Sequence, residues 1–190
     1  MVGISFAVYA VVRHGGVSNS TQTAGNTFLA DGTSSVLLAP AQAAGERAAP
    51  ERCGQTSALS TCVEYRSAKY HFSLFYPSVL GVKTYDEGGG AMTIVFENAK
   101  LVQGFQIFVV PYSQPQVTEQ RFKQDEPSGV RTNVQNIQID GAVGAAFFSK
   151  NALGDTYEVW FIHGGYLFEV TALRQDEDEL NDALRTWQFI

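Results

Sequence analysis

The pattern of apolar and polar positions changes near Lys69 and predicts a run of β-strands beyond it. In KYHFSLFYP, Tyr70, Phe72, Leu74 and Tyr76 alternate along one face before Pro77 ends the run. Alternation with a period of two is typical of a half-buried strand. Similar runs, bounded by glycines or polar turns, predict further strands at 80–87, 91–98, 104–112, 130–139, 142–150, 156–162 and 166–173.

Two helices are predicted, one within the run of strands and one after it. The first covers 118–126, with Thr118 as its N-cap and an end before Pro127. The second covers 176–190, where Leu180, Leu184 and Trp187 fall on one apolar stripe.

The order of these elements indicates the fold class. Neighbouring strands joined by hairpin turns, with helices kept apart from them, indicate an α+β fold. Central strands such as EVWFI (158–162) are apolar on both faces and need cover on both sides. We therefore expect an antiparallel sheet of seven or eight strands flanked by helices, an α/β/α sandwich.

The first third of the chain has a different composition, which divides the sequence into three parts. Residues 1–12 are apolar except for Ser5, too short to span a bilayer, and resemble a truncated membrane anchor or a signal-like segment. Residues 13–66 are rich in small and polar residues, so we expect a flexible linker. Residues 67–190 form the expected globular domain.

Two cysteines, Cys53 and Cys62, lie at the end of the expected linker. Their separation matches neither a zinc site nor a thioredoxin motif. A disulfide between them would close a small loop if the compartment is oxidising, and two reduced thiols are the alternative. Because the apolar N-terminus hints at export, we favour the disulfide and an extracytoplasmic location, with tethering to the cell envelope through the N-terminus.

Charge excludes one class of partner. The formal net charge is −6. Sequence-independent binding to nucleic acid needs clustered Lys and Arg residues that replace counterions, so we expect no nucleic-acid partner.

The stretch VWFIHGGYLFEVTA (159–172) raises the question of catalysis. A His followed by two glycines begins the oxyanion-hole loop of many esterases, which also need a later Gly-x-Ser-x-Gly elbow for the nucleophile. The chain has no such elbow, and neither Ser nor Cys follows Gly165. We therefore expect Gly164-Gly165 to form a hairpin turn with positive φ angles, and His163 to lie near a strand end.

Other candidate chemistry is equally incomplete. His14, His71 and His163 show no zinc-ligand spacing. Acidic residues 176–179 could bind a hard cation, but carboxylates in a first helical turn also stabilise the helix dipole, which we favour. Residues 88–90 are three glycines between strands, with no phosphate-loop lysine after them. We thus assign no catalytic, cofactor-binding or metal-binding residue and no cofactor.

Several features together resemble the PsbP-like superfamily. They are FSLFYP at 72–77, Asp140-Gly141 before a strand of small residues, the hairpin, and the end LRTWQFI at 184–190. The resemblance covers 67–190 and is to small bacterial extracytoplasmic members of unknown function. It implies an α/β/α sandwich with an antiparallel sheet, usually without catalysis and commonly outside the cytoplasm.

These observations lead to two functional expectations of different class. The first is a non-catalytic, envelope-associated accessory domain that binds or helps assemble a protein partner. The second is a carrier of a small molecule or ion, held in a pocket between sheet and helix. A deep aromatic-lined cavity would favour the second, and a filled core would favour the first.

Overall fold

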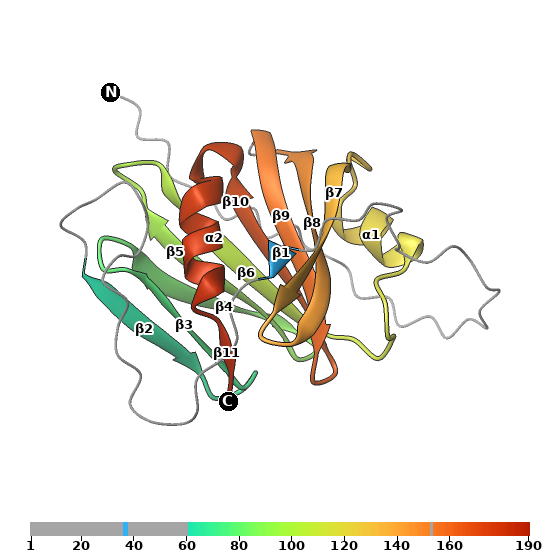
Figure 1. The fold of residues 1–190 in the computed structure, drawn as a ribbon, viewed down its shortest axis with the longest axis horizontal. Coiled ribbons are helices and arrows are strands. Elements are labelled where there is room, and N and C mark those ends of the chain that lie inside the picture. The colour runs from blue at the N-terminus through green and yellow to red at the C-terminus, as the bar shows by residue number, and fades with distance from the viewer. Residues whose placement is uncertain (1–35, 38–60, 153) are drawn as a thin grey trace.

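A computed structural model describes residues 61–152 and 154–190, and the backbone of residues 36–37 (Figure 1). The described part is mostly β-structure with two short α-helices, so the expected α+β class is confirmed. The predicted strands and helices are nearly all present, and their ends differ from the predictions by a few residues.

The main sheet has eight strands in the order β1-β7-β8-β9-β10-β6-β5-β4. All neighbouring pairs are antiparallel except β1 and β7, which are parallel. Its strands are β1 (Val36–Leu37), β4 (Gly81–Gly88), β5 (Ala91–Asn98), β6 (Gln103–Pro111), β7 (Thr132–Ile139), β8 (Ala142–Asn151), β9 (Gly154–His163) and β10 (Tyr166–Leu173).

A second sheet of three strands was not predicted. It has the order β11-β3-β2 and contains β2 (Cys62–Ser67), β3 (Phe72–Pro77) and β11 (Gln188–Phe189). The expectation that FSLFYP joins the main sheet is therefore wrong. β3 instead pairs with β2 and β11. These pairings were not predicted because β2 lies in a segment whose composition resembled a linker and because β11 has only two residues.

The helices are α1 (Glu119–Asp125) and α2 (Glu177–Arg185), the latter preceded by a 3₁₀ turn, Arg174–Asp176. Thr118 is the N-cap of α1, as predicted, and its side chain accepts a hydrogen bond from the Arg121 N–H.

The final helix ends earlier than the prediction of residue 190. The Thr186 hydroxyl lies 2.6 Å from the Ala183 carbonyl and accepts a 2.8 Å hydrogen bond from the Phe75 N–H. Residues 188–189 can then pair with β3, which continues the chain as a strand.

One face of the main sheet, here called the aromatic face, carries the larger hydrophobic core. The small sheet and α2 pack on this face, and in Figure 1 both lie on the same side of the main sheet. Trp187 stacks on Phe72 with ring centroids 4.2 Å apart, and both are buried. The buried residues of this face on β5, β6, β9 and β10 are Ile94, Phe96, Phe105, Ile107, Val109, Val159, Phe161, Phe168 and Val170.

The opposite face, here called the acidic face, has a smaller core beneath α1. Phe122 of α1 contacts Phe147 and Trp160, with ring centroids 5.8 and 5.6 Å away. Two carboxyl groups are buried on the same side of the strands, at Glu158 and Glu169. The buried residues of this face on β8, β9 and β10 include Phe147, Glu158, Trp160, Leu167, Glu169 and Thr171.

The described ranges also bear on the N-terminal third. β2 begins five residues before the expected domain start at 67, and β1 lies inside the expected linker 13–66. The apolar segment 1–12 and Cys53 lie outside the described residues, so the anchor and the Cys53–Cys62 disulfide stay predictions. No helix in the described part is long and apolar enough to cross a membrane.

Candidate functional site

The stretch that raised the question of catalysis is a hairpin, as predicted. His163 pairs with Tyr166 across the turn between β9 and β10. Gly164 and Gly165 have φ angles of 57° and 83°, which a two-residue primed turn requires. The His163 ring stacks on Phe189, with centroids 3.6 Å apart. These contacts place His163 at the end of the aromatic face.

The other sequence candidates have ordinary structural positions. Residues 88–90 connect β4 and β5, and the Gly90 carbonyl accepts a 2.8 Å hydrogen bond from the Tyr70 hydroxyl. His71 is exposed at a turn with φ 54°. Within residues 61–152 and 154–190 no group of His, Cys, Asp and Glu is arranged to hold a metal ion.

A buried polar cluster beneath α1 was missed by the sequence analysis. Arg121 forms an ion pair with Asp125 one turn along the helix, and its Nη2 lies 3.5 Å from Glu169 Oε1. Glu126, at the end of α1, contacts the Ser149 hydroxyl of β8. This cluster ties α1 to the acidic face through polar contacts as well as through Phe122.

Glu158 is the most buried carboxyl group of this cluster. The Thr171 hydroxyl donates to Glu158 Oε2 at 2.7 Å, and the Trp160 indole N–H donates to it at 3.3 Å. Glu158 Oε1 has no hydrogen-bond partner among the described residues. Burial, and to a smaller extent the charge of Glu126, raise the pKa of Glu158 to about 8. The side chain is therefore mainly protonated at neutral pH.

A second carboxyl with a raised pKa lies at the start of α2. Burial, followed by the nearby charge of Asp176, raises the pKa of Glu179 to about 7. The Gln103 side chain donates a hydrogen bond to Glu179, and the Gly104 N–H donates to Asp176 at 3.4 Å. Residues 177–179 thus lie in the first turn of α2, where the dipole interpretation places them. The contacts of Asp176 and Glu179 also join the start of α2 to the first residues of β6.

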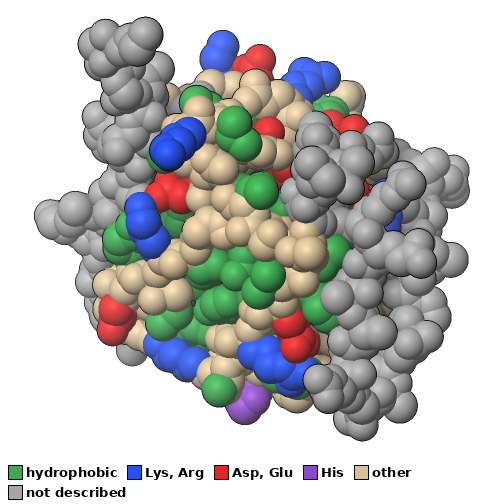
Figure 2. Space-filling model, turned by 90° about the vertical axis from the view of Figure 1, so that its left-hand side faces the viewer, with side chains coloured by type: hydrophobic (Ala, Val, Ile, Leu, Met, Phe, Trp, Pro, Cys, Tyr) green, Lys and Arg blue, Asp and Glu red, His purple; other side chains and the backbone are tan. Residues whose placement is uncertain are grey.

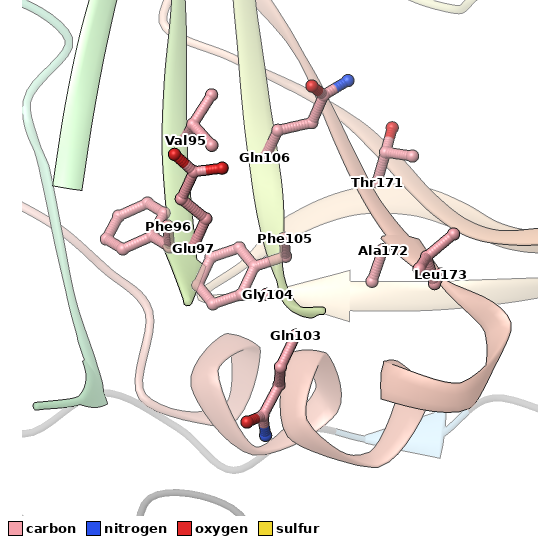
Figure 3. A pocket seen from close by; sticks show the side chains of 10 residues that line it. All are labelled: Val95, Phe96, Glu97, Gln103, Gly104, Phe105, Gln106, Thr171, Ala172 and Leu173. Carbon is pink, nitrogen blue, oxygen red and sulfur yellow. The ribbon is translucent and has the colours of Figure 1, made fainter. Parts of the chain in front are cut away.

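A cavity of about 50 Å³ lies next to this contact, across the ends of three neighbouring strands (Figure 3). Val95 of β5, Gln106 of β6 and Thr171 of β10 lie side by side along it, and Gln103 lies next to α2. Metabolite sites are commonly 300–1,000 Å³, so this cavity has room for water rather than for a metabolite.

A larger cavity, about 130 Å³, lies between α2 and the β7 side of the main sheet. Its walls combine apolar and polar side chains. They are Gln135 and Ile137 of β7, Tyr157 and Val159 of β9, and Glu177, Asn181, Leu184 and Arg185 of α2. The Tyr157 hydroxyl donates a 3.1 Å hydrogen bond to Asn181 across it.

The residues of β8 explain why space remains there. In the strand register, Ala146 lies between Gln135 and Val159, and Gly144 lies between Ile137 and Phe161. Both residues are small, so β8 leaves space between the larger side chains of β7 and β9. A side chain at Gly144 would meet the Trp160 carbonyl oxygen at 2.4 Å, which keeps this position small.

A strand from the N-terminal third lies at the edge of the sheet beside this cavity. Val36 pairs with Ile137, and Leu37 pairs with Gln138, in parallel orientation (Figure 1). Ile137 also lines the cavity. The edge of β7 therefore accepts an extended segment from elsewhere in the chain, next to a hollow in the neighbouring face.

Exposed apolar side chains also gather where strands of the two sheets end. Val63 of β2, Val79 after β3, and Leu101 and Val102 between β5 and β6 are 38–61% exposed. The Asn98 side chain donates to the Val79 carbonyl at 3.1 Å and so joins two of these segments. Figure 2 shows hydrophobic side chains gathered on the left-hand side of the molecule in Figure 1, with Lys, Arg, Asp and Glu around them.

Comparison with known proteins does not assign the chain to a family. No family model matches the chain, and no curated protein matches it.

Proposed function

We propose that this protein is a non-catalytic accessory domain that binds a protein partner in the cell envelope and helps to assemble or hold it. The observation that carries the proposal is the edge of β7, which pairs with a strand from a distant part of the chain. Open sheet edges are common sites of recognition because their backbone groups are available to another strand.

The size of the cavities supports a protein partner over a metabolite. The two cavities described above measure about 50 and 130 Å³, below the usual range for small-molecule sites. Aromatic side chains fill the interior on the aromatic face instead, as in the stacked pairs Phe72–Trp187 and Phe161–Phe168. The exposed apolar residues at the strand ends give further surface for a partner.

Location outside the cytoplasm belongs to the same proposal. It is supported by the apolar residues 2–12 and by the cysteine pair, which would form a disulfide in an oxidising compartment. A relationship to PsbP-like proteins, with the α/β/α sandwich that it implies, is likewise proposed. Its support is the order of strands, the hairpin, and the C-terminal helix α2, which Trp187 follows.

The test is affinity capture with the full chain, tagged at its C-terminus, from cross-linked envelope and cytosolic fractions of the host. We expect one dominant partner in the envelope fraction and labelling of Cys53 and Cys62 only after reduction. Recovery of the protein in the cytosolic fraction with both thiols free, or the absence of any enriched partner, would contradict the proposal.

A carrier of a small ion or a small polar fragment is the second candidate. The cavity between α2 and β7 favours it, because Glu177, Asn181 and Arg185 bring polar groups to an apolar pocket. A thermal-shift screen of metabolites and metal ions tests this candidate. A rise in melting temperature that Asn181→Trp abolishes would support it over the accessory function.

A further inference from the structure

We propose that the outer edge of β7 is a peptide-binding site, which takes up an extended apolar segment in parallel orientation. Val36–Leu37 is then a resident segment that such a peptide displaces. This inference rests on the proposed function and specifies the partner: a protein that presents a free strand with aliphatic side chains at alternate positions.

The backbone of β7 provides the first part of the argument. β7 has eight residues, and within the described part of the chain its outer edge is paired only with Val36 and Leu37. The remaining outward N–H and C=O groups of an edge strand can form a ladder with an added strand. Among the described residues no other strand pairs with this edge, so a peptide longer than the resident pair could extend the ladder along β7.

The cavity beside β7 provides the second part. A residue that pairs with Ile137 in register lies on the same face of the sheet as Ile137, which lines the cavity. One side chain in every two of an added strand would then point toward α2. Main-chain hydrogen bonds give affinity in such complexes, and pockets for alternate side chains give specificity.

The lining decides which side chain fits. Ile137, Val159 and Leu184 provide an apolar wall, and the volume of about 130 Å³ suits one aliphatic group. Glu177 and Arg185 bring opposite charges to the site, so neither an acidic nor a basic side chain has a net advantage. An aliphatic residue is thus the occupant that the chemistry selects.

The resident segment lowers the apparent affinity for other peptides. Val36–Leu37 and β7 belong to one chain, so their pairing is intramolecular, and linked segments reach effective concentrations on the order of millimolar. A partner strand must compete with it, so the protein binds when the partner is locally concentrated. Removing the resident segment should therefore expose the site.

The experiment uses the full chain and a fluorescent peptide, GTSSVLLA, which copies residues 32–39. Binding is measured by anisotropy to the wild-type protein and to the double variant Val36→Pro/Leu37→Pro, whose resident segment lacks two N–H donors. We expect binding to the double variant to be at least tenfold tighter than to the wild-type protein. The same peptide with N-methyl groups on its Val and the following Leu should bind at least tenfold more weakly.

Two variants of α2 locate the site. Asn181→Trp, built into the double variant, places a large side chain in the cavity and should weaken peptide binding at least tenfold. Asp178→Trp places the same side chain at an exposed position of the same helix and should leave binding within twofold. Thermal melting of each variant shows that it folds, and the N-methyl comparison decides the matter without any substitution in α2.

The inference is overturned if the N-methylated and unmodified peptides bind equally, if wild-type and double variant have equal affinity, or if Asn181→Trp behaves like Asp178→Trp. Its failure can be told apart from failure of the proposed function. A cellular partner captured equally by wild-type and Asn181→Trp proteins leaves the accessory function standing and removes this site. If the peptide binds at the site but no cellular partner is captured, the peptide-binding site stands and the accessory function is removed.

Discussion

The two faces of the main sheet are buried by different means. On the aromatic face, the small sheet and α2 cover stacked rings, with Trp187 in contact with Phe72, Phe161 and Phe168. On the acidic face, the seven-residue helix α1 covers a few aromatic rings together with carboxyl groups and Arg121. The same strands contribute residues to both.

The two faces should therefore contribute differently to the pH dependence of the free energy of unfolding. Apolar burial contributes about 25 cal/mol per Å² whatever the pH. A buried carboxyl group contributes or costs free energy according to its protonation state. The stacked rings of the aromatic face should therefore stabilise the fold over a wide pH range, with Glu179 at the start of α2 as the titrating group on that side. The acidic face, with Glu158 at its centre, should make the protein sensitive to alkaline conditions.

The largest expected effect is on the aromatic face. Trp187→Ala should lower the free energy of unfolding by about 3–5 kcal/mol, because it leaves a cavity among buried rings. Urea unfolding at pH 5 and pH 8 should give nearly the same loss. Tyr85→Ala on the edge strand β4, where the side chain is half-buried, is the control and should cost about 1 kcal/mol or less. A loss for Trp187→Ala no larger than for this control would contradict the description of the aromatic face.

A smaller effect, with a pH dependence, is expected for Glu158→Gln on the acidic face. The folded-state pKa of Glu158 is about 8, against an ordinary value of 4.5. Between these values the folded state holds a proton that the unfolded chain has lost, so stability is full below about pH 4.5 and is lost as pH rises through 8. The slope is about 1.4 kcal/mol per pH unit. The neutral Gln side chain should therefore stabilise the protein by about 3 kcal/mol at pH 7 and by much less at pH 5.

Chemical unfolding from pH 4 to 9 measures this prediction. Glu87→Gln, an exposed position on β4, is the matched control and should leave the wild-type pH profile unchanged in shape. If the Glu158→Gln and wild-type profiles remain parallel across this range, Glu158 is not protonated in the folded protein and the comparison of the two faces fails.

The smallest expected effect concerns the N-terminus of α1. Thr118→Ala removes the hydrogen bond to the Arg121 N–H and should cost about 1 kcal/mol. Thr118→Ser keeps the acceptor and should recover most of that loss. Equal destabilisation by both substitutions would mean that the cap does not hold α1 on the acidic face.

The elements that the sequence predicted well are those with a strong local pattern. The alternation of FSLFYP, the glycine pair at 164–165 and the cap at Thr118 each report a local conformation directly. β2 and β11 have no such pattern, because they are strands only through pairing with β3. The second sheet therefore could not be predicted from periodicity.

The candidate sites show the same limit. Glu158 and Glu169 stand within apolar strands, EVWFI and YLFEV, and that signal could have marked them as buried carboxyl groups. Their meeting with Arg121 depends on how α1 crosses the sheet. The cavity beside β7 depends on Gly144 and Ala146 lying between two larger neighbours, which only the strand register reveals.

The central claim, that the β7 edge exchanges one extended segment for another, is tested most directly by amide hydrogen exchange in Thr132–Ile139. The amides near Ile137 and Gln138 that face away from β8, opposite Val36 and Leu37, should be protected in the wild-type protein and should exchange at least tenfold faster in Val36→Pro/Leu37→Pro. Protection should return when the GTSSVLLA peptide is added. Equal exchange in all three samples would show that no segment occupies this edge and would contradict the account.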